Sequence, residues 1–354
     1  MKNRKLGIIL LLIIGSLLFS SCSRTLSATS WPGTTVEGET AFVAYGNGVY
    51  SVDLNSAGIN WSYPNDEKSQ AQFYAPPLIH EGLLIVGDYE KTLYGLEEST
   101  GMQKWSFEAN GKWIASPMVK DEMIFAPCAD HNLYALDLNG NLQWTFETGQ
   151  ALWSQPVSNG GDIYLGSMDH SVYAINPKNG ALAWQKDLGG AIVSTPFLDE
   201  ESGILYVGTL ANEVVALDTE RGSEIWRYET VSGLWGTPVI NEGVLYFADD
   251  LGNIYALTAG EKLSEVWKME TQEVITGSPA ITPDGLVFQT ESGTVLFVKF
   301  DGKSKRAQTI EGSLYGAPQT NEDFLVISIA KADNLLSIMD FDGNEVRTFA
   351  PPKK

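Results

Sequence analysis

The stretch of residues 153–186, WSQPVSNGGDIYLGSMDHSVYAINPKNGALAWQK, is one unit of a pattern that recurs along almost the whole chain. Apolar and aromatic side chains alternate with a period of two in residues 162–165 and 172–175, which is typical of half-buried strands and not of helices. Turn residues separate these segments from two further strands, one at residues 155–158 and one that carries Trp184. One unit is therefore predicted to be a four-stranded antiparallel meander.

A proline opens the first predicted strand of every copy and sets the register of the repeat. Neighbouring prolines are 39 to 45 residues apart, and the eight are Pro32, Pro77, Pro117, Pro156, Pro196, Pro238, Pro279 and Pro318. This spacing matches the roughly 40 to 50 residues of a propeller blade. The sequence predicts an all-β, eight-bladed propeller, which needs no long exposed strand edge because the ring closes on itself.

The repeat assigns residues 31–350 to one propeller domain, although a chain of 354 residues would ordinarily suggest two domains. The formal net charge is −21, and the chain without residues 1–21 carries 20 basic and 44 acidic side chains, a net charge of −24. Such acidity excludes nucleic acid as a partner. We expect a monomeric propeller whose partners are neutral, basic or bound through local patches.

The amino terminus reads as an export signal. Lys2, Arg4 and Lys5 precede an apolar run of 14 residues, and small residues then lead to Cys22. This order predicts a signal peptide over residues 1–21, because the run is shorter than the roughly 20 residues that span a bilayer. Residues 19–22, FSSC, resemble the bacterial lipobox, although Phe19 stands where that motif prefers leucine.

The lipobox resemblance implies that Cys22 becomes the acylated first residue of the mature chain; the alternative is an ordinary signal with an incidental cysteine. Residues 22–30 would then tether the propeller to an extracytoplasmic membrane surface, and residues 351–354 form a short tail. Ser23 in place of aspartate resembles lipoproteins of outer membranes, but the sequence leaves open which membrane holds the anchor. Cys128 is the one other cysteine, so acylation of Cys22 would preclude an intramolecular disulfide.

Six units carry a tryptophan in the fourth predicted strand: Trp61, Trp105, Trp144, Trp184, Trp226 and Trp267. Residues 174–184, AINPKNGALAW, and 216–226, ALDTERGSEIW, resemble the tryptophan-docking motif of pyrroloquinoline quinone (PQQ)-type propellers, with alanine, glycine and tryptophan at positions 1, 7 and 11. We expect each indole to fill the gap to a neighbouring blade, while small residues such as Ala174 leave room for it. The last two units lack the tryptophan, so other side chains must pack there.

Turn-forming residues lie between the second and third predicted strands: Asn47, His131, His170, Asn212, Gly252, Gly293 and Asp333. These residue types tolerate the positive φ that a tight hairpin requires. The pairs Asp130–His131 and Asp169–His170 would suit a metal or a proton transfer, but their equivalent repeat positions favour the turn interpretation. Pro127 cannot donate to a strand ladder and predicts a bulge or a strand end.

Large aromatic residues precede five of the opening prolines: Tyr74, Trp153, Trp235 and Tyr315 by three positions and Trp113 by four. First strands of a propeller are innermost, so these residues should ring one mouth of the central channel. They could contact a ligand or partner, or they could pack against one another and plug the axis.

The resemblance to PQQ-type propellers raises an enzymatic alternative, a PQQ-dependent dehydrogenase. That family implies a vicinal cysteine pair, a metal bound by carboxylates and long cofactor-binding insertions. The sequence has no cysteine pair and no room for such insertions in units of 39 to 45 residues, and a turn explains the adjacent Asp249 and Asp250. No catalytic residue, metal site or cofactor is predicted. The chain more closely resembles the BamB family of outer-membrane assembly lipoproteins, which implies a non-catalytic protein-interaction scaffold. A cell-surface ligand-binding or sensor propeller is the other interpretation.

Overall fold

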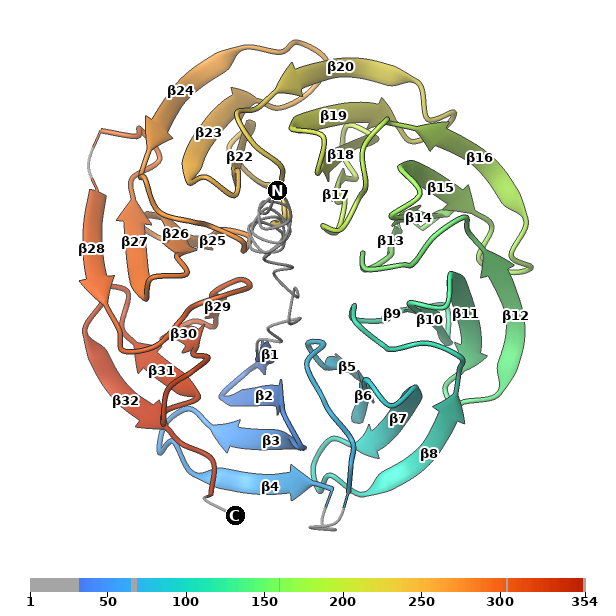
Figure 1. Ribbon diagram of the computed structural model, residues 1–354, viewed down its shortest axis with the longest axis vertical. Helices are drawn as coiled ribbons and strands as arrows, with labels where there is room; N and C mark the ends of the chain where they lie inside the picture. The colour runs from blue at the N-terminus through green and yellow to red at the C-terminus, as the bar shows by residue number, and fades with distance from the viewer. Residues whose placement is uncertain (1–31, 65–68, 159, 304, 353–354) are drawn as a thin grey trace, which may run out of the picture. The chain divides into compact units, whose positions relative to one another are not determined.

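The computed structural model describes residues 32–64, 69–158, 160–303 and 305–352; the predicted signal peptide and the whole predicted tether, which begins with Cys22, lie outside them. The described residues form 32 strands in eight four-stranded sheets arranged around one axis (Figure 1). The prediction of an eight-bladed all-β propeller is confirmed. Among the described residues, no helix has the length and apolarity to cross a membrane.

Each blade contains four consecutive strands, and we number the blades in chain order. Blade 1 contains β1 (Gly33–Glu37), β2 (Thr40–Tyr45), β3 (Gly48–Asp53) and β4 (Ile59–Tyr63). Blade 2 contains β5 (Leu78–His80), β6 (Leu83–Gly87), β7 (Thr92–Glu97) and β8 (Gln103–Glu108). Blade 3 contains β9 (Met118–Lys120), β10 (Met123–Pro127), β11 (Asn132–Asp137) and β12 (Leu142–Glu147). Blade 4 contains β13 (Val157–Ser158), β14 (Ile163–Gly166), β15 (Ser171–Ile175) and β16 (Leu182–Asp187).

The second half of the ring repeats the arrangement. Blade 5 contains β17 (Phe197–Asp199), β18 (Ile204–Thr209), β19 (Glu213–Asp218) and β20 (Glu224–Glu229). Blade 6 contains β21 (Val239–Asn241), β22 (Val244–Ala248), β23 (Asn253–Thr258) and β24 (Glu265–Glu270). Blade 7 contains β25 (Ala280–Thr282), β26 (Gly285–Gln289), β27 (Thr294–Val298) and β28 (Lys305–Thr309). Blade 8 contains β29 (Gln319–Thr320), β30 (Leu325–Ser328), β31 (Leu336–Met339) and β32 (Glu345–Phe349).

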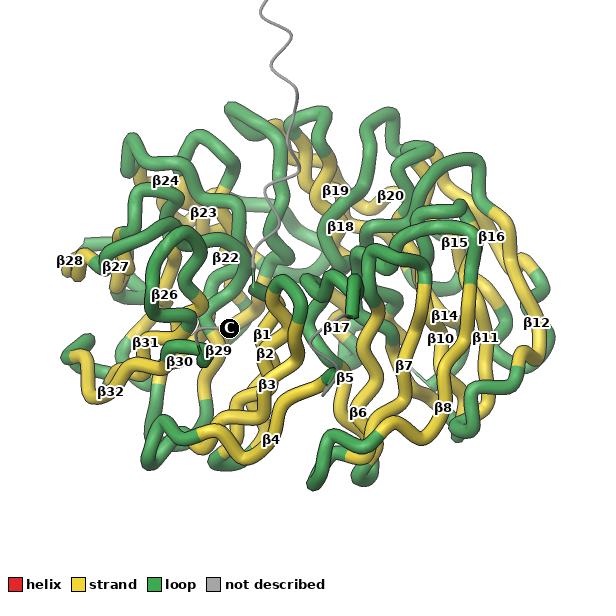
Figure 2. Tube along the Cα trace, turned by 60° about the horizontal axis from the view of Figure 1, so that its bottom comes forward, coloured by secondary structure: helices red, strands yellow, loops and turns green. Residues whose placement is uncertain are grey.

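Within every blade the strands pair antiparallel in chain order, with the first strand nearest the axis and the fourth at the outside (Figure 1). The turns and loops gather at the two opposite faces of the ring (Figure 2). Each of the eight prolines immediately precedes a first strand, as the register predicted. Pro127 is the last residue of β10, so it marks a strand end.

The hydrophobic core is divided among the seams between blades. Eight clusters of buried side chains are present in the described residues, and each combines residues of two adjacent blades. The second and third strands supply most of these side chains; β18, for example, is buried along its whole length. Each blade therefore depends on its neighbours to cover both faces of its sheet.

The six tryptophans of the motif lie in the fourth strands, and each indole N–H donates a hydrogen bond to a backbone carbonyl of the following blade. The donor–acceptor distances are 2.7 to 3.1 Å, and the pairs are Trp61 with Glu98, Trp105 with Leu138, Trp144 with Pro177, Trp184 with Thr219, Trp226 with Gly260 and Trp267 with Phe300. The rings thus bridge six of the eight seams.

A glycine of the following blade lies against the indole at five of these seams. At Gly222, where φ is 68°, an added Cβ would stand 2.5 Å from the ring of Trp184. Glycine therefore permits the left-handed turn and also leaves space for the ring. Within its own blade, Trp184 lies opposite Ala174 on the adjacent strand. The indole is thus placed between a small residue of its own blade and the turn glycine of the next.

Arginine occupies the tryptophan position in blades 7 and 8. Arg306 lies opposite Phe297, where the other blades place a small residue opposite the indole. Its Nη2 donates to the carbonyl of Phe341 in blade 8 at 3.3 Å, and its guanidinium lies 4.3 Å from the centre of the Phe297 ring. The aromatic ring has moved from the fourth strand to the third, and the arginine takes over the hydrogen bond to the next blade.

The ring closes between blades 8 and 1 without an exchange of strands, since each of the two sheets is built from consecutive strands. A buried cluster that includes Val43, Leu54 and Ile338 joins the two blades. Near the axis, the hydroxyls of Thr34 and Ser328 are 2.6 Å apart and form a buried hydrogen bond. Closure therefore uses the same side-chain packing as the other seams.

The hairpin prediction holds for five of the seven named residues. His131, His170, Asn212, Gly252 and Gly293 have positive φ. It is wrong for Asn47 and Asp333, because the positive φ in those two blades falls on Gly46 and Lys331. In blade 1 Gly46 stands one position before Asn47, and glycine adopts the left-handed conformation without a steric clash.

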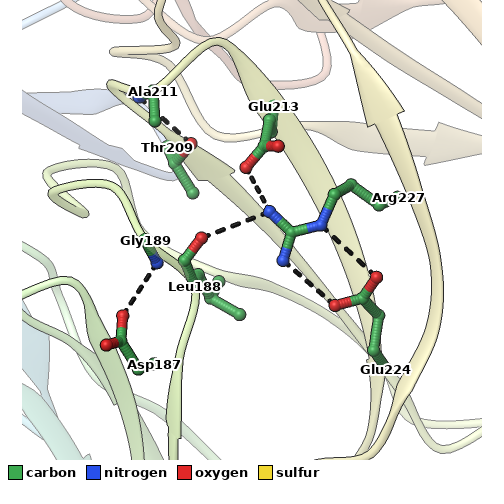
Figure 3. A network of polar contacts seen from close by, with 8 residues as sticks. All are labelled: Asp187, Leu188, Gly189, Thr209, Ala211, Glu213, Glu224 and Arg227. Carbon is green, nitrogen blue, oxygen red and sulfur yellow. Dashed lines mark hydrogen bonds and ion pairs between the residues drawn. The ribbon is translucent and has the colours of Figure 1, made fainter.

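A charged network fixes the outer strand of blade 5 to the end of blade 4 (Figure 3). The Arg227 guanidinium donates to both carboxylate oxygens of Glu224, at 3.3 and 3.0 Å, and to the Leu188 carbonyl at 3.2 Å, and it also pairs with Glu213. These hydrogen bonds from Arg227 hold the pKa of Glu224 below its usual value. The network satisfies two acidic side chains on a strongly acidic chain.

The seam contacts make the Trp184→Ala variant informative. We expect it to lower the free energy of unfolding by about 3 kcal/mol, at the low end for removal of a large aromatic side chain because the ring is only partly buried. Urea denaturation measures the change. The control is Leu182→Ala in the same strand, where a side chain 48% exposed should cost less than about 0.5 kcal/mol. Equal midpoints for wild type and Trp184→Ala would contradict a role of the indole in holding the seam.

Candidate functional site

Two sets of connections form one face of the ring, which we call the mouth face. They are the loops that lead from a fourth strand to the next first strand and the turns that join second to third strands. The inner ends of the loops are tied from blade to blade. Ser116 Oγ donates to the Pro76 carbonyl at 2.7 Å, and Gln155 Nε2 donates to the Pro117 carbonyl at 2.9 Å. These hydrogen bonds hold the loops of neighbouring blades to one another on the mouth face.

A hydrogen bond between an aspartate and a tyrosine recurs beside the mouth-face turns. In four blades an aspartate that follows the second strand accepts a hydrogen bond from the hydroxyl of a third-strand tyrosine, and the pairs are Asp88 with Tyr94, Asp130 with Tyr134, Asp169 with Tyr173 and Asp249 with Tyr255. Asp130 and Asp169 also accept backbone N–H groups of the adjacent loop, Asn110 at 2.9 Å and Gly149 at 2.6 Å. The geometry of both Asp–His pairs is thus that of a turn.

The five aromatic residues predicted at the rim differ in their burial and in their contacts. Trp113 is 1% exposed and packs against Phe107 and Tyr134 in the seam between blades 2 and 3. Its placement at the rim was wrong. Residues at the same four-residue offset from the proline, Leu152 and Leu234, are also fully buried. The sequence distance to the proline could have indicated this burial, because Ile114, and not Trp113, stands three residues before the proline in this unit.

The two tyrosines are held by neighbouring side chains. Tyr74 is half-buried, with its ring centre 4.7 Å from that of Tyr89 and 6.1 Å from that of Tyr45. Tyr315 is 5% exposed and accepts a hydrogen bond of 2.9 Å from Lys331 Nζ. These side chains mainly pack the mouth face near the closing seam.

Trp153 and Trp235 are half-buried, so part of each ring remains accessible on the mouth face. Three apolar side chains around blade 6 are still more exposed: Val231 at 54%, Leu251 at 56% and Val274 at 38%. Val231 and Leu251 flank the same aspartate, since the neighbouring Ser232 N–H and the Leu251 N–H both donate to Asp249. We call these three side chains and Trp235 the blade 6 patch.

A polar cavity of about 520 Å³ lies on the mouth face at the closing seam, lined by Tyr45, Glu311, Lys331, Ala332, Asp333 and Asn334. One amine, two carboxylates and an amide suit a small polar ligand rather than a flat quinone, which needs an aromatic surface to stack on. Neither Trp153 nor Trp235 lines this cavity. The cavity and the blade 6 patch are therefore separate features.

Cys128 is fully buried in the seam between blades 2 and 3. Burial raises the pKa of its thiol to about 12, so the thiolate needed for nucleophilic or redox chemistry is not formed near neutral pH. This cysteine has the environment of a packing residue.

Comparison with known families decides the identity of the fold. A family model described as "Outer membrane protein assembly factor BamB" matches residues 45–197 and 169–263, which together are more than half of the chain. The chain belongs to this BamB family. No curated protein matches the chain.

Solved structures agree with the BamB-like architecture. The crystal structure of BamB from Moraxella catarrhalis superposes with a TM-score of 0.77 over 87% of this chain and 96% of that chain, at 14% sequence identity. A computationally designed protein, Ika8, superposes with a TM-score of 0.76 over 88% of this chain and 97% of that chain, at 12% identity. At such identities the likeness establishes the propeller fold alone, and a designed ring with this fold illustrates that the fold does not fix the function.

Proposed function

We propose that the chain is a non-catalytic, lipid-anchored extracytoplasmic propeller that acts as a protein-interaction scaffold in outer-membrane protein assembly. Membership of the BamB family is the observation that carries the proposal. The blade 6 patch supports it, because a half-buried tryptophan beside exposed aliphatic side chains is typical of the anchors of protein interfaces. The acidic net charge favours a partner with a neutral or basic surface.

The enzymatic alternative is not favoured by any side-chain constellation on the mouth face. Dehydrogenation with a quinone needs the cofactor held against fixed donors and a cation where charge develops. The two accessible tryptophans supply flat apolar surface but no charge, and the aspartates beside the turns are already hydrogen-bonded to tyrosines and backbone groups. A ligand-binding or sensor role is supported by the polar cavity at the closing seam, which is the second candidate site.

The partner-binding surface can be tested with a double variant. We expect Trp153→Ser with Trp235→Ser to reduce capture of a protein partner from detergent-solubilised membranes at least tenfold, because interface aromatics commonly contribute 2 kcal/mol or more. Quantitative crosslinking followed by mass spectrometry measures the capture.

Leu182→Ser, on an outer strand and 48% exposed, is the matched control and should capture as wild type does. Undiminished capture by the double variant would move the contact away from the aromatic residues of the mouth face. Saturable PQQ binding by the wild type with substrate turnover would contradict the scaffold function.

The anchor depends on Cys22 and is tested separately. In a Cys22→Ala variant we expect loss of the acyl mass and release of the protein from the membrane fraction, because the apolar run alone is too short for a stable span. Fractionation and intact-mass measurement of the processed protein check both effects. A variant that stays membrane-bound with a processed amino terminus and no acyl mass would show that another element anchors the chain.

A further inference from the structure

The face opposite the mouth carries the turns that join first to second strands. In blade 2 His80 ends β5 and Glu81 begins this turn, and in blade 3 the turn contains Asp121 and Glu122. One ring nitrogen of His80 and one carboxylate oxygen each of Glu81 and Glu122 lie within 4.8 Å of one another. The two turns are about one repeat apart in the sequence, and the ring brings them side by side.

The backbone of both turns is left-handed. Glu81 and Gly82 have φ values of 46° and 79°, and Asp121 and Glu122 have φ values of 48° and 61°, the signature of a tight primed hairpin turn. Blade 6 makes the same turn with Glu242 and Gly243. Blade 3 therefore has glutamate at the position where blades 2 and 6 have glycine, although glycine adopts that conformation more readily.

The imidazole of the cluster has an unused donor or acceptor. His80 is half-buried, and its Nε2 atom is shielded from solvent without a hydrogen-bond partner among the described residues. Buried polar atoms are usually satisfied, so the unpaired nitrogen of this imidazole points to a missing partner. The ammonium of Lys120, the last residue of β9 in blade 3, lies 3.9 Å from the Asp121 carboxylate and pairs with that group.

The donor set selects the kind of ion. One imidazole and two carboxylates suit a four-coordinate Zn²⁺ with a water in the remaining position, whereas Ca²⁺ takes six to eight oxygen ligands. With bonds of about 2.0 to 2.2 Å, tetrahedral ligands stand roughly 3.3 Å apart. Glu81 and Glu122 are exposed, so their side chains are free to close the present separation by rotation.

We propose that His80, Glu81 and Glu122 form a Zn²⁺ site that joins blade 2 to blade 3. The sequence pattern did not reveal it, because the three ligands come from two hairpins and have no metal-binding spacing. The ion would supply a link across a seam on the face that the mouth-face partner leaves free. The site is independent of the scaffold function and can fail without affecting it.

The test is a Zn²⁺ titration of the mature chain, carrying no polyhistidine tag and freed of metal with a chelator. Calorimetry should show one ion per chain, and His80→Asn and Glu122→Gln should each weaken binding at least tenfold. X-ray absorption should report one imidazole nitrogen among oxygen ligands. Glu122→Gly is the sharpest variant: it should abolish binding while the metal-free protein melts at or above the wild-type temperature, because glycine relieves the left-handed backbone.

Matched controls use the same residue types elsewhere in the ring. His131→Asn alters a turn histidine on the mouth face, and Glu242→Gln alters the equivalent turn of blade 6; neither should change the affinity for Zn²⁺. The proposal is overturned if the wild type binds no ion at one-to-one stoichiometry, or if His80→Asn and Glu122→Gly bind as the controls do. Several weak ions per chain, lost equally in all variants, would identify adventitious binding only and would also overturn it.

Discussion

The contact of each fourth strand with the following blade is the interaction on which the ring depends. A blade of four short strands cannot bury its own faces, so each seam must be filled and its backbone groups satisfied. An indole does both, because its flat ring covers apolar surface and its N–H reaches a carbonyl that the turn would otherwise leave to water. The turn glycine is the second half of the contact: at Gly222 a methyl group would collide with Trp184.

Blades 7 and 8 show what this contact requires. At the seam between them, Arg306 keeps the hydrogen bond to the next blade while Phe297 supplies the ring, so the two functions of tryptophan are divided between neighbouring strands. The sequence predicted a change at these blades because tryptophan is missing there. It could not identify the replacement, since Phe297 and Arg306 become a pair only through the register of β27 and β28.

Local periodicity and turn chemistry were sufficient to predict the fold. The features that the sequence did not reveal depend on which residues of neighbouring blades lie close together. The prolines, the alternating strands and the recurring tryptophans are sequence-local signals, and they gave the number of blades and the strand order. Trp113 failed as a rim residue because burial depends on a one-residue offset in the loop. The cluster of His80 with Glu122 was invisible for a related reason, since those residues meet only when two blades are placed side by side.

The seam contacts of the ring and its proposed binding surface are separate. The blade 6 patch lies on the mouth face, whereas the indoles that hold the seams contact the turns between third and fourth strands, so binding of the proposed partner need not disturb the blade contacts. Hydrogen exchange of the indole N–H groups, followed by NMR with labelled tryptophan, tests the seam contacts most directly. The account predicts slow exchange for the six tryptophans that donate across seams and for buried Trp113, and fast exchange for Trp153 and Trp235. Seam indoles that exchange as fast as those of Trp153 and Trp235 would contradict it.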